Sequence, residues 1–369
     1  MDFDVQRVEF SDLPGWHDDN PLPLLPALRR CHHQVSTVKP HRTGALGISS
    51  TDLMPAYEAA LSTAPADAAG ARNFFETHFV PFRIVRRDGG SGFVTAFYEP
   101  DVEVSDMPDG TYRFPFYRRP EDLADIDDSN RPAGMDPYFA FGRSRDGVIG
   151  EYPDRRAIEE GFLAGRGLEI AYAKSKVDVF FAHVQGAARL VFPNGSVRRI
   201  TYAAKTGHPF SATGKLLIER GKIDARTVSM QSIRHWLETH PDQADEVLWH
   251  NRSFIFFREA EVSDDGLGPI AAAKVALEPG RSLAVDRLIH TFGVPFFIAS
   301  DSLTTIDGGR PFRRLMLALD TGSAIVGPAR GDIFTGSGDE AGRMAGAVRN
   351  EADFFVFIPR GAAARYGHG

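Results

Sequence analysis

Residues 315–346 carry the pattern that most restricts how this chain can fold. Five consecutive apolar residues, 315–319, predict a buried strand that ends at Asp320. A loop rich in Gly, Ala, Ser and Pro leads to Asp332, which opens a second short apolar piece. The small-residue segment up to Gly346 begins with acidic residues, as helices often do. The region therefore predicts a strand, a loop, a second short apolar element and a helix, with one aspartate at each end of the loop.

Asp320 and Asp332 are candidates for acid–base chemistry. Carboxylates at strand and loop ends, among residues that let another chain come close, suit a catalytic acid. The alternative is that Asp320 caps a turn and Asp332 is solvated, because aspartate has a general preference for turns.

The composition favours a β-rich protein with many loops. The chain has 369 residues, enough for two domains or one large one, with 36 glycines, 24 prolines and 28 phenylalanines. Its net charge of -7 argues against a general nucleic-acid binder, which needs a cationic face to neutralise phosphates. That charge does not argue against a neutral or amphoteric polymer such as a glycan.

Neither a disulfide, a metal centre nor a membrane span is expected. Cys31 is the only cysteine, and the 12 histidines show no His-Glu-x-x-His spacing, so we expect no metal and no cofactor. No stretch is long and apolar enough to cross a bilayer. The N-terminal sequence MDFDVQRVEF lacks the basic start, apolar middle and cleavage site of a signal peptide.

Local patterns predict several further elements. Apolar spacing predicts helices over 51–61 and 69–79. The dipeptide Asn194-Gly195 between two alternating runs is a strong hairpin signal. Residues 120–136 are acidic, polar and Pro-containing, which predicts a surface excursion.

Five stretches, taken together and in order, resemble the MltA family of lytic murein transglycosylases. They are GFVTAFYEP at 92–100, VDVFFAHVQG at 177–186, FIFFR at 254–258, PGRSLAVD at 279–286 and the segment at 319–346. Each is weak alone, but their order is specific, and the resemblance extends over about residues 82–359. The C-terminal part also resembles the 3D domain, named for three aspartates, which would be Asp286, Asp320 and Asp332.

The resemblance implies a mainly β fold with a few helices. The family has two β-domains flanking a long groove. One is a double-psi β-barrel built from both chain ends, here 1–100 and 259–369. The other is a smaller β-barrel domain inserted in the middle, here 101–258.

The resemblance also implies an activity. Family members cleave the β-1,4 bond between N-acetylmuramic acid and N-acetylglucosamine in peptidoglycan, and the product ends in 1,6-anhydromuramic acid. The family's catalytic acid aligns with Asp332. Because the C6 hydroxyl of the sugar is the nucleophile, one carboxyl can act as acid and then as base, provided that its pKa is raised. Asp320 and Asp286 are the candidates for supporting roles, with structural turn roles as the alternative.

Three candidate substrate-binding residues fall in the first two motifs. Tyr98 could stack on a sugar and Glu99 could accept hydroxyl hydrogen bonds; the alternatives are packing between domains and a salt bridge. Gln185 could bind an N-acetyl group, and Gly186 after it suggests close backbone approach. The family usually has Ser after this glycine, whereas this chain has Ala187, which weakens any claim for a hydroxyl contact.

Two basic residues complete the candidate set. Lys205 follows the hairpin and could contact substrate, although a plain turn is the simpler interpretation. Arg281 is the other candidate substrate contact, and its alternative is a structural ion pair with Asp286.

Two other functions stay open from the sequence. One is a glycan-binding protein without activity, and the other is a hydrolase that uses Asp332 with Asp320 or Glu99. The expected partner is the peptidoglycan glycan strand, with a peripheral association with the outer membrane or other cell-wall enzymes. The substrate would place the protein in the cell envelope, in the periplasm or at the outer membrane. The family's usual lipid anchor does not carry over, because no apolar stretch precedes Cys31.

Overall fold

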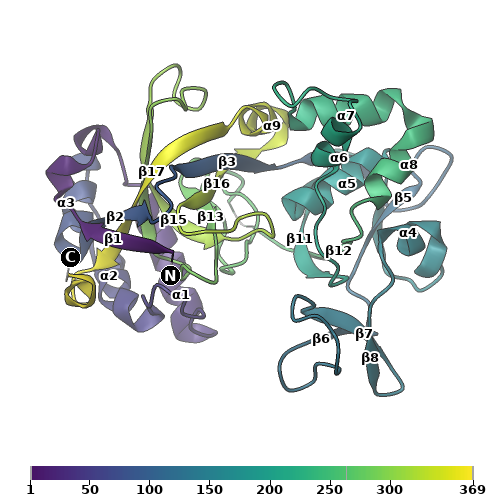
Figure 1. Ribbon diagram of the computed structural model, residues 1–369, viewed down its shortest axis with the longest axis horizontal. Coiled ribbons are helices and arrows are strands. Elements are labelled where there is room, and N and C mark those ends of the chain that lie inside the picture. The colour runs from purple at the N-terminus through teal and green to yellow at the C-terminus, as the bar shows by residue number, and fades with distance from the viewer. Residues whose placement is uncertain (1, 263, 368–369) are drawn as a thin grey trace. The chain divides into compact units, whose positions relative to one another are not determined.

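The chain divides into two compact units, each with its own buried core (Figure 1). The computed structural model describes residues 2–262 and 264–367. The first unit contains the residues up to Tyr98 and those from Val262 onward, and the second is Glu99–Glu261. The sequence predicted an insertion over 101–258. Both ends of the chain therefore belong to the first unit.

The first unit contains an eight-stranded sheet in which six strands close into a ring. The order is β1-β2-β17-β14-β15-β13-β16-β3, and β3 also pairs with β17, so the six strands from β17 to β3 form a closed circuit. Closure removes the open edges that an ordinary sheet would expose. The strands are β1 (Phe3–Arg7), β2 (Phe79–Arg86), β3 (Gly92–Glu99), β13 (Ser282–Val285), β14 (Pro295–Ser300), β15 (Phe312–Asp320), β16 (Arg330–Ser337) and β17 (Arg349–Pro359).

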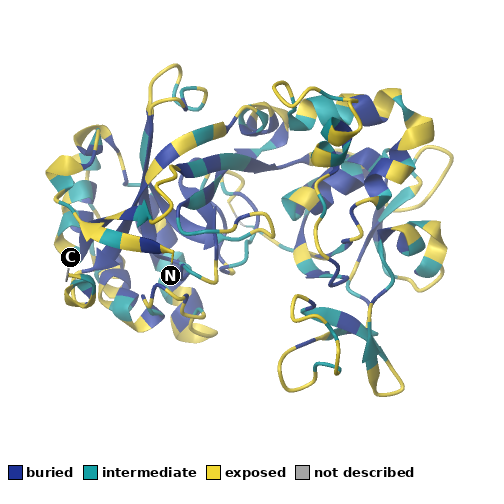
Figure 2. Ribbon diagram, viewed as in Figure 1, coloured by how far each residue is buried: buried dark blue, intermediate teal, exposed yellow. Residues whose placement is uncertain are grey.

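Most apolar residues of the ring strands are buried in the core of the first unit. Residues 315–319 of β15 are all buried, and so is every residue of β14 (Figure 2). A strand buried on both faces reads as a continuous apolar run, which is why the run at 315–319 predicted this strand correctly. The prediction was wrong about Asp332, which lies inside β16 and not at its start.

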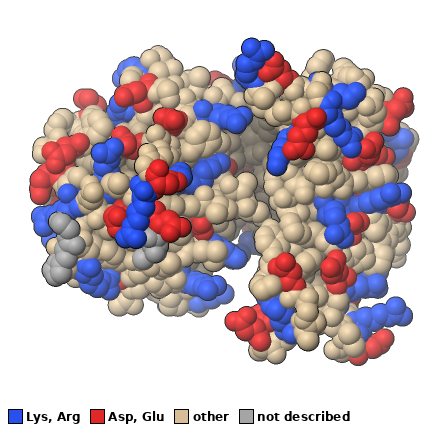
Figure 3. Space-filling model, viewed as in Figure 1, with Lys and Arg blue, Asp and Glu red and all other residues tan. Residues whose placement is uncertain are grey.

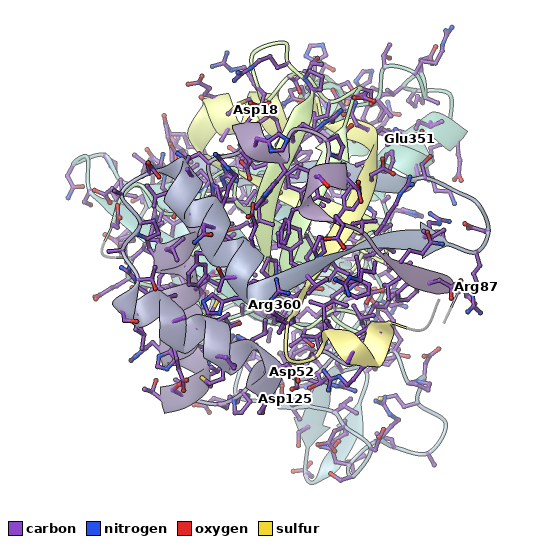
Figure 4. The ribbon with its side chains drawn as sticks, turned by 90° about the vertical axis from the view of Figure 1, so that its left-hand side faces the viewer. Asp18, Asp52, Arg87, Asp125, Glu351 and Arg360 are labelled. Atoms are coloured by element: carbon purple, nitrogen blue, oxygen red, sulfur yellow. The ribbon has the colours of Figure 1, made fainter. Side chains whose placement is uncertain are left out.

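In the described part of the first unit, four α-helices accompany the sheet, together with short 3-10 turns. The helices expected at 51–61 and 69–79 are confirmed to within one residue at each end. At the C-terminal side, the guanidinium of Arg360 (labelled in Figure 4) donates to carbonyls of Glu76, Thr77 and Phe79 at the end of α3. The elements are α1 (Leu24–Thr37), α2 (Ser50–Ser62), α3 (Ala68–His78), α9 (Gly338–Gly346), and the 3-10 turns Phe10–Asp12, Trp16–Asp18 and Ala363–Tyr366.

The second unit contains a six-stranded sheet and a separate three-stranded one. The larger sheet has the order β12-β11-β10-β4-β9-β5, and a bridge between Arg118 and Phe257 joins its two edge strands. The predicted hairpin is confirmed as β10 paired with β11 around Asn194-Gly195. The strands are β4 (Asp101–Ser105), β5 (Phe114–Tyr117), β6 (Leu123–Asp125), β7 (Phe141–Arg145), β8 (Val148–Gly150), β9 (Glu169–Ala173), β10 (Ala187–Val191), β11 (Val197–Lys205) and β12 (Ile255–Glu259).

The segment 120–136 is more than a surface excursion, because β6 lies within it and pairs with β7 in the three-stranded sheet. The helices of the second unit are α4 (Arg155–Ala157), a π-helical turn (Ile158–Phe162), α5 (Lys176–Gln185), α6 (Thr213–Glu219), α7 (Met230–Thr239) and α8 (Pro241–Trp249).

The face of the molecule in view carries charges of both signs. Lys and Arg side chains alternate there with Asp and Glu over both units (Figure 3). Among the described residues, no helix has both the length and the apolar character that a membrane span requires.

Candidate active site

The register of three neighbouring strands brings Asp320 and Asp332 together. Asp320 is the last residue of β15 and is paired with Ala284 of β13. On its other side, Ala284 is paired with Asp332 of β16. The two aspartates are therefore separated by one strand, although a loop divides them in the sequence. Each keeps a partly accessible surface.

Burial raises the pKa of both carboxyl groups. For Asp320 the pKa rises to about 6, chiefly because its carboxylate is desolvated, while amide hydrogen bonds from Thr321 and Ala272 oppose the rise and the charge of Asp332 adds to it. Burial also raises the pKa of Asp332, against the lowering effects of a Thr95 hydrogen bond and the Arg330 charge. Two carboxyl groups so placed resist joint ionisation, which is the condition that a general acid needs near neutral pH.

Thr95 contacts Asp332 and Arg330 contacts Thr95, and sequence reasoning missed both. The Thr95 hydroxyl, from β3, donates to Asp332 Oδ1. Arg330 Nη2 in turn donates to Thr95 Oγ1 at 2.7 Å. Thr95 lies inside the motif at 92–100, so the motif could have directed attention to it; Arg330 lies two residues before Asp332, where side chains of a strand share a face.

Asp286 has a structural position at the end of β13. It is buried, and its carboxylate accepts hydrogen bonds from the amides of Leu288 at 3.0 Å and Gly327 at 2.9 Å. These bonds fasten the turn after β13 to the loop between β15 and β16. Asp286 therefore holds in place the loop that leads into the strand of Asp332.

The ion pair expected between Asp286 and Arg281 does not form. Arg281 instead pairs with Asp19, with Nη2 at 2.7 Å from Oδ1, and also donates to the carbonyls of Leu315 and Asn20. Asp19 lies more than 260 residues earlier in the chain, so local sequence gave no sign of it. Arg281 is buried by these contacts, which makes it part of the internal structure of the first unit.

Tyr98 and Glu99, at the end of β3, are both buried. The ring of Tyr98 lies against α9 so closely that a Cβ on Gly342 would stand 2.7 Å from its Cε2. The carboxylate of Glu99 forms an ion pair with Arg199 of β11, at 3.5 Å between Oε2 and Nη2. The salt-bridge alternative for Glu99 therefore describes its position.

Gln185 and Lys205 keep accessible surface in the second unit. Gln185 ends α5, and Gly186 is its left-handed cap with φ 76°, with no heavy atom near its missing Cβ. The left-handed conformation is reason enough for glycine at this position. Lys205 Nζ donates to the hydroxyl of Tyr138 at 3.1 Å and lies 4.7 Å from the ring centroid.

Metal ligands do not gather in the described part of the chain, where no group of three or more His, Cys, Asp or Glu side chains could hold an ion. Asp332 instead accepts a hydrogen bond from the Thr95 hydroxyl, and Asp320 accepts one from the Ala272 amide.

Comparison with known proteins places the chain in a family. The MltA specific insert domain matches residues 93–258, and the 3D domain matches residues 281–358. The crystal structure of a membrane-bound lytic murein transglycosylase from Agrobacterium tumefaciens is 61% identical, with a TM-score of 0.94, over 98% of this chain and 99% of that one. The chain belongs to the MltA family.

More distant MltA proteins agree. The Escherichia coli (strain K12) membrane-bound lytic murein transglycosylase A is 33% identical over 258 residues, which make up 68% of this chain. That alignment spans only 61% of the length of the relative. The crystal structure of Escherichia coli MltA with bound chitohexaose is 26% identical, with a TM-score of 0.69, over 98% of this chain and 94% of that one.

The two MltA-type matches divide the candidate residues between them. Asp286, Asp320 and Asp332 lie within the 3D domain match, and Arg330 lies there as well. Thr95 lies within the insert-domain match, although its strand β3 belongs to the ring of the first unit. The candidate acid and its hydroxyl partner thus come from opposite ends of the chain.

Proposed function

We propose that this MltA protein is a peptidoglycan lytic transglycosylase. It would cleave the β-1,4 bond between N-acetylmuramic acid and N-acetylglucosamine and leave a 1,6-anhydromuramic acid end. The observation that carries the proposal is Asp332: a partly buried carboxyl whose pKa is raised by burial, held by a hydroxyl from another strand. The names of the similar proteins support the choice of murein as substrate.

One carboxyl can perform both proton transfers of this reaction. Protonated Asp332 gives its proton to the glycosidic oxygen as the bond from C1 to that oxygen breaks. The C6 hydroxyl of the same muramic acid then attacks C1, and the Asp332 carboxylate takes the hydroxyl proton. The enzyme ends the cycle protonated, and no water is consumed.

Asp320 and Asp286 would support Asp332 in different ways. Asp320 lies one strand away, and its negative charge would favour the protonated form of Asp332. Asp286 would support Asp332 only by holding the backbone at Leu288 and Gly327 in place, because both of its carboxylate oxygens accept amide hydrogen bonds there.

Glycan strands are the proposed partner. Escherichia coli MltA has been solved with chitohexaose, a chain of sugars, and this chain resembles it over nearly its whole length. Gln185 and Lys205 keep accessible polar groups and would contact the glycan. Tyr98, Glu99 and Arg281 are buried, so we propose that each supports the structure of its own unit and does not bind sugars directly.

Two further features belong to the proposal. The ring of six strands would be the double-psi β-barrel of the family. The substrate would place the protein in the cell envelope, at the periplasmic face or in peripheral association with the outer membrane. Both are supported by family membership.

Product analysis on purified sacculi tests the function. The wild-type protein is expected to release anhydromuropeptides, and Asp332→Asn should release them at least about 100-fold more slowly, because it cannot deliver a proton. A product heavier by one water would indicate a hydrolase with a second carboxylate, for which Asp320 is the nearest candidate. Binding to sacculi without any release would indicate a glycan-binding protein. Full activity in Asp332→Asn would overturn the role given to that residue.

A further inference from the structure

Arg330 is a cation without an acidic partner beside the candidate acid. It begins β16 and shares a face of that strand with Asp332. Its guanidinium donates to the Thr95 hydroxyl at 2.7 Å and to the carbonyl of Gly331, and it lies 5.5 Å from the ring centroid of Phe93. No carboxylate in the described part of the chain forms an ion pair with it, so it does not serve as one half of a salt bridge.

The hydrogen bonds from Arg330 have a direction. A guanidinium can only donate, so Thr95 Oγ1 must accept from Arg330. The hydrogen of the Thr95 hydroxyl is then donated to Asp332 Oδ1. Oδ1 is therefore an acceptor whether or not Asp332 is protonated, and the acidic proton belongs on Oδ2. Among the described residues, none donates a hydrogen bond to Oδ2.

We propose that Arg330 is a positioning residue that orders the chain from Arg330 through Thr95 to Asp332, so that Oδ2 carries the proton given to substrate. This inference rests on the proposed function. Arg330 acts through Thr95 and does not touch the substrate. Without it, the Thr95 hydroxyl is free to accept from Asp332, and the proton can settle on the oxygen that faces the protein.

The charge of Arg330 has a second consequence. It favours the carboxylate of Asp332 and lowers the pKa that burial raises. The other charged groups around the pair are Asp320 on β15, whose charge is coupled to Asp332, and Lys274, whose charge acts on Asp320. From β3 the group that touches Asp332 is the neutral Thr95 hydroxyl. Arg330 thus stabilises the form of Asp332 that must accept the second proton.

Substitutions at Arg330 test the proposal through the pH profile of turnover on sacculi. Activity requires protonated Asp332 and should fall as pH rises. Arg330→Met is expected to move this fall to higher pH, because the stabilising cation is gone, and to lower turnover by about tenfold through lost orientation. Arg330→Lys should keep the position of the fall. The pKa of Asp320 is also raised by burial, so each profile is repeated in the Asp320→Asn background.

Matched variants separate positioning from general damage. Arg83 of β2 is exposed and pairs with Asp353, away from Thr95 and Asp332 in the hydrogen-bond network, so Arg83→Met should leave the profile unchanged. Thr95→Ser keeps the hydroxyl and should retain most activity, whereas Thr95→Val should lose about as much as Arg330→Met.

An unmoved profile in a folded Arg330→Met protein, or full activity in Thr95→Val, overturns the proposal. If Asp332→Asn is fully active, the role proposed for Asp332 fails and this inference falls with it; if Asp332→Asn is inactive while Arg330→Met is normal, only this inference fails.

Discussion

Asp320 lies between opposing influences on its protonation. Amide hydrogen bonds from Ala272 and Thr321 stabilise its carboxylate, but desolvation and the nearby charge of Asp332 act against it, and the net effect raises the pKa to about 6. The folded protein therefore holds a proton on Asp320 between about pH 4 and 6, where the unfolded chain has released it. Because the folded state binds more protons there, the contribution of Asp320 to stability falls as pH rises through this range.

The variant Asp320→Asn should remove this pH dependence. Asparagine cannot ionise, but its side-chain oxygen can still accept a hydrogen bond from the Ala272 amide. Relative to wild type, the free energy of unfolding of the variant should grow between pH 4 and 6 and level off above, with a total change of up to about 3 kcal/mol. Urea unfolding at pH 4, 5, 6 and 7 measures it. A difference that stays constant over this range would mean that Asp320 keeps an ordinary pKa in the folded protein.

At the residue scale, the sequence identified chemical groups better than their partners. Asp320 and Asp332 were singled out because both follow or begin apolar runs at a loop. Thr95, Arg199 and Asp19 were not, because each meets its partner across a long separation that only folding closes, such as 237 residues between Thr95 and Asp332. For the same reason Glu99 and Arg281, expected to bind substrate, proved to be buried ion-pair residues.

At the scale of elements, β3 closes the ring and carries Thr95. It pairs with β17, and Gly92 lies opposite Ala352 in this register. A Cβ on Gly92 would stand 2.5 Å from the Ala352 carbonyl oxygen and 2.7 Å from Phe354 Cδ2. Neither the carbonyl nor the packed ring can move away easily, so the absence of a side chain at 92 lets the two strands meet.

Gly92→Ala should therefore weaken the closure of the ring. We expect a loss of about 1–3 kcal/mol in the free energy of unfolding and a lower turnover, since Thr95 lies three residues further along the same strand. Gly361→Ala is the matched control: no heavy atom lies within 4 Å of its missing Cβ, so its effect should stay within about 0.5 kcal/mol. If urea unfolding gave both variants the same stability, β3 and β17 would be able to move apart around a Cβ at residue 92 without loss of stability, and the prediction would be wrong.

Elements with strong local signals were predicted from sequence, and those defined by context were not. The hairpin at Asn194-Gly195, the strand at 315–320 and the helices α2 and α3 were found because turn chemistry and apolar spacing suffice for them. The role of Gly186 as the left-handed cap of α5 was not predicted, because the end of that helix was not recognised in the sequence. Strand β6 went unrecognised because it is only three residues long and lies in a segment whose other residues are mainly acidic, polar or Pro.

At the scale of the molecule, the second unit has a stabilising centre of its own. Arg155 is fully buried there and donates to the carbonyls of Asn251 at 3.0 Å and Ser253 at 2.7 Å. It also pairs with Glu159 at 3.2 Å and lies 4.8 Å from the ring centroid of Phe180. The core of the first unit shares no residue with the three clusters of the second. Separate cores predict separate unfolding transitions.

Calorimetry of the Arg155→Met protein should reveal this separation. Removing the guanidinium leaves two buried carbonyls without this donor and takes one partner from Glu159, which keeps Trp249 and Lys176; the loss costs about 3–5 kcal/mol. For a unit of this size, that lowers the transition of the second unit by about 10 °C and leaves the first transition in place. Arg226→Met is the control, because Arg226 is exposed and pairs with Asp224 at the surface, so it should move neither transition measurably. Gly92→Ala should move only the first transition. If Arg155→Met and Gly92→Ala instead shift one common transition, the two cores unfold as one, and damage in the second unit would also reach Asp332.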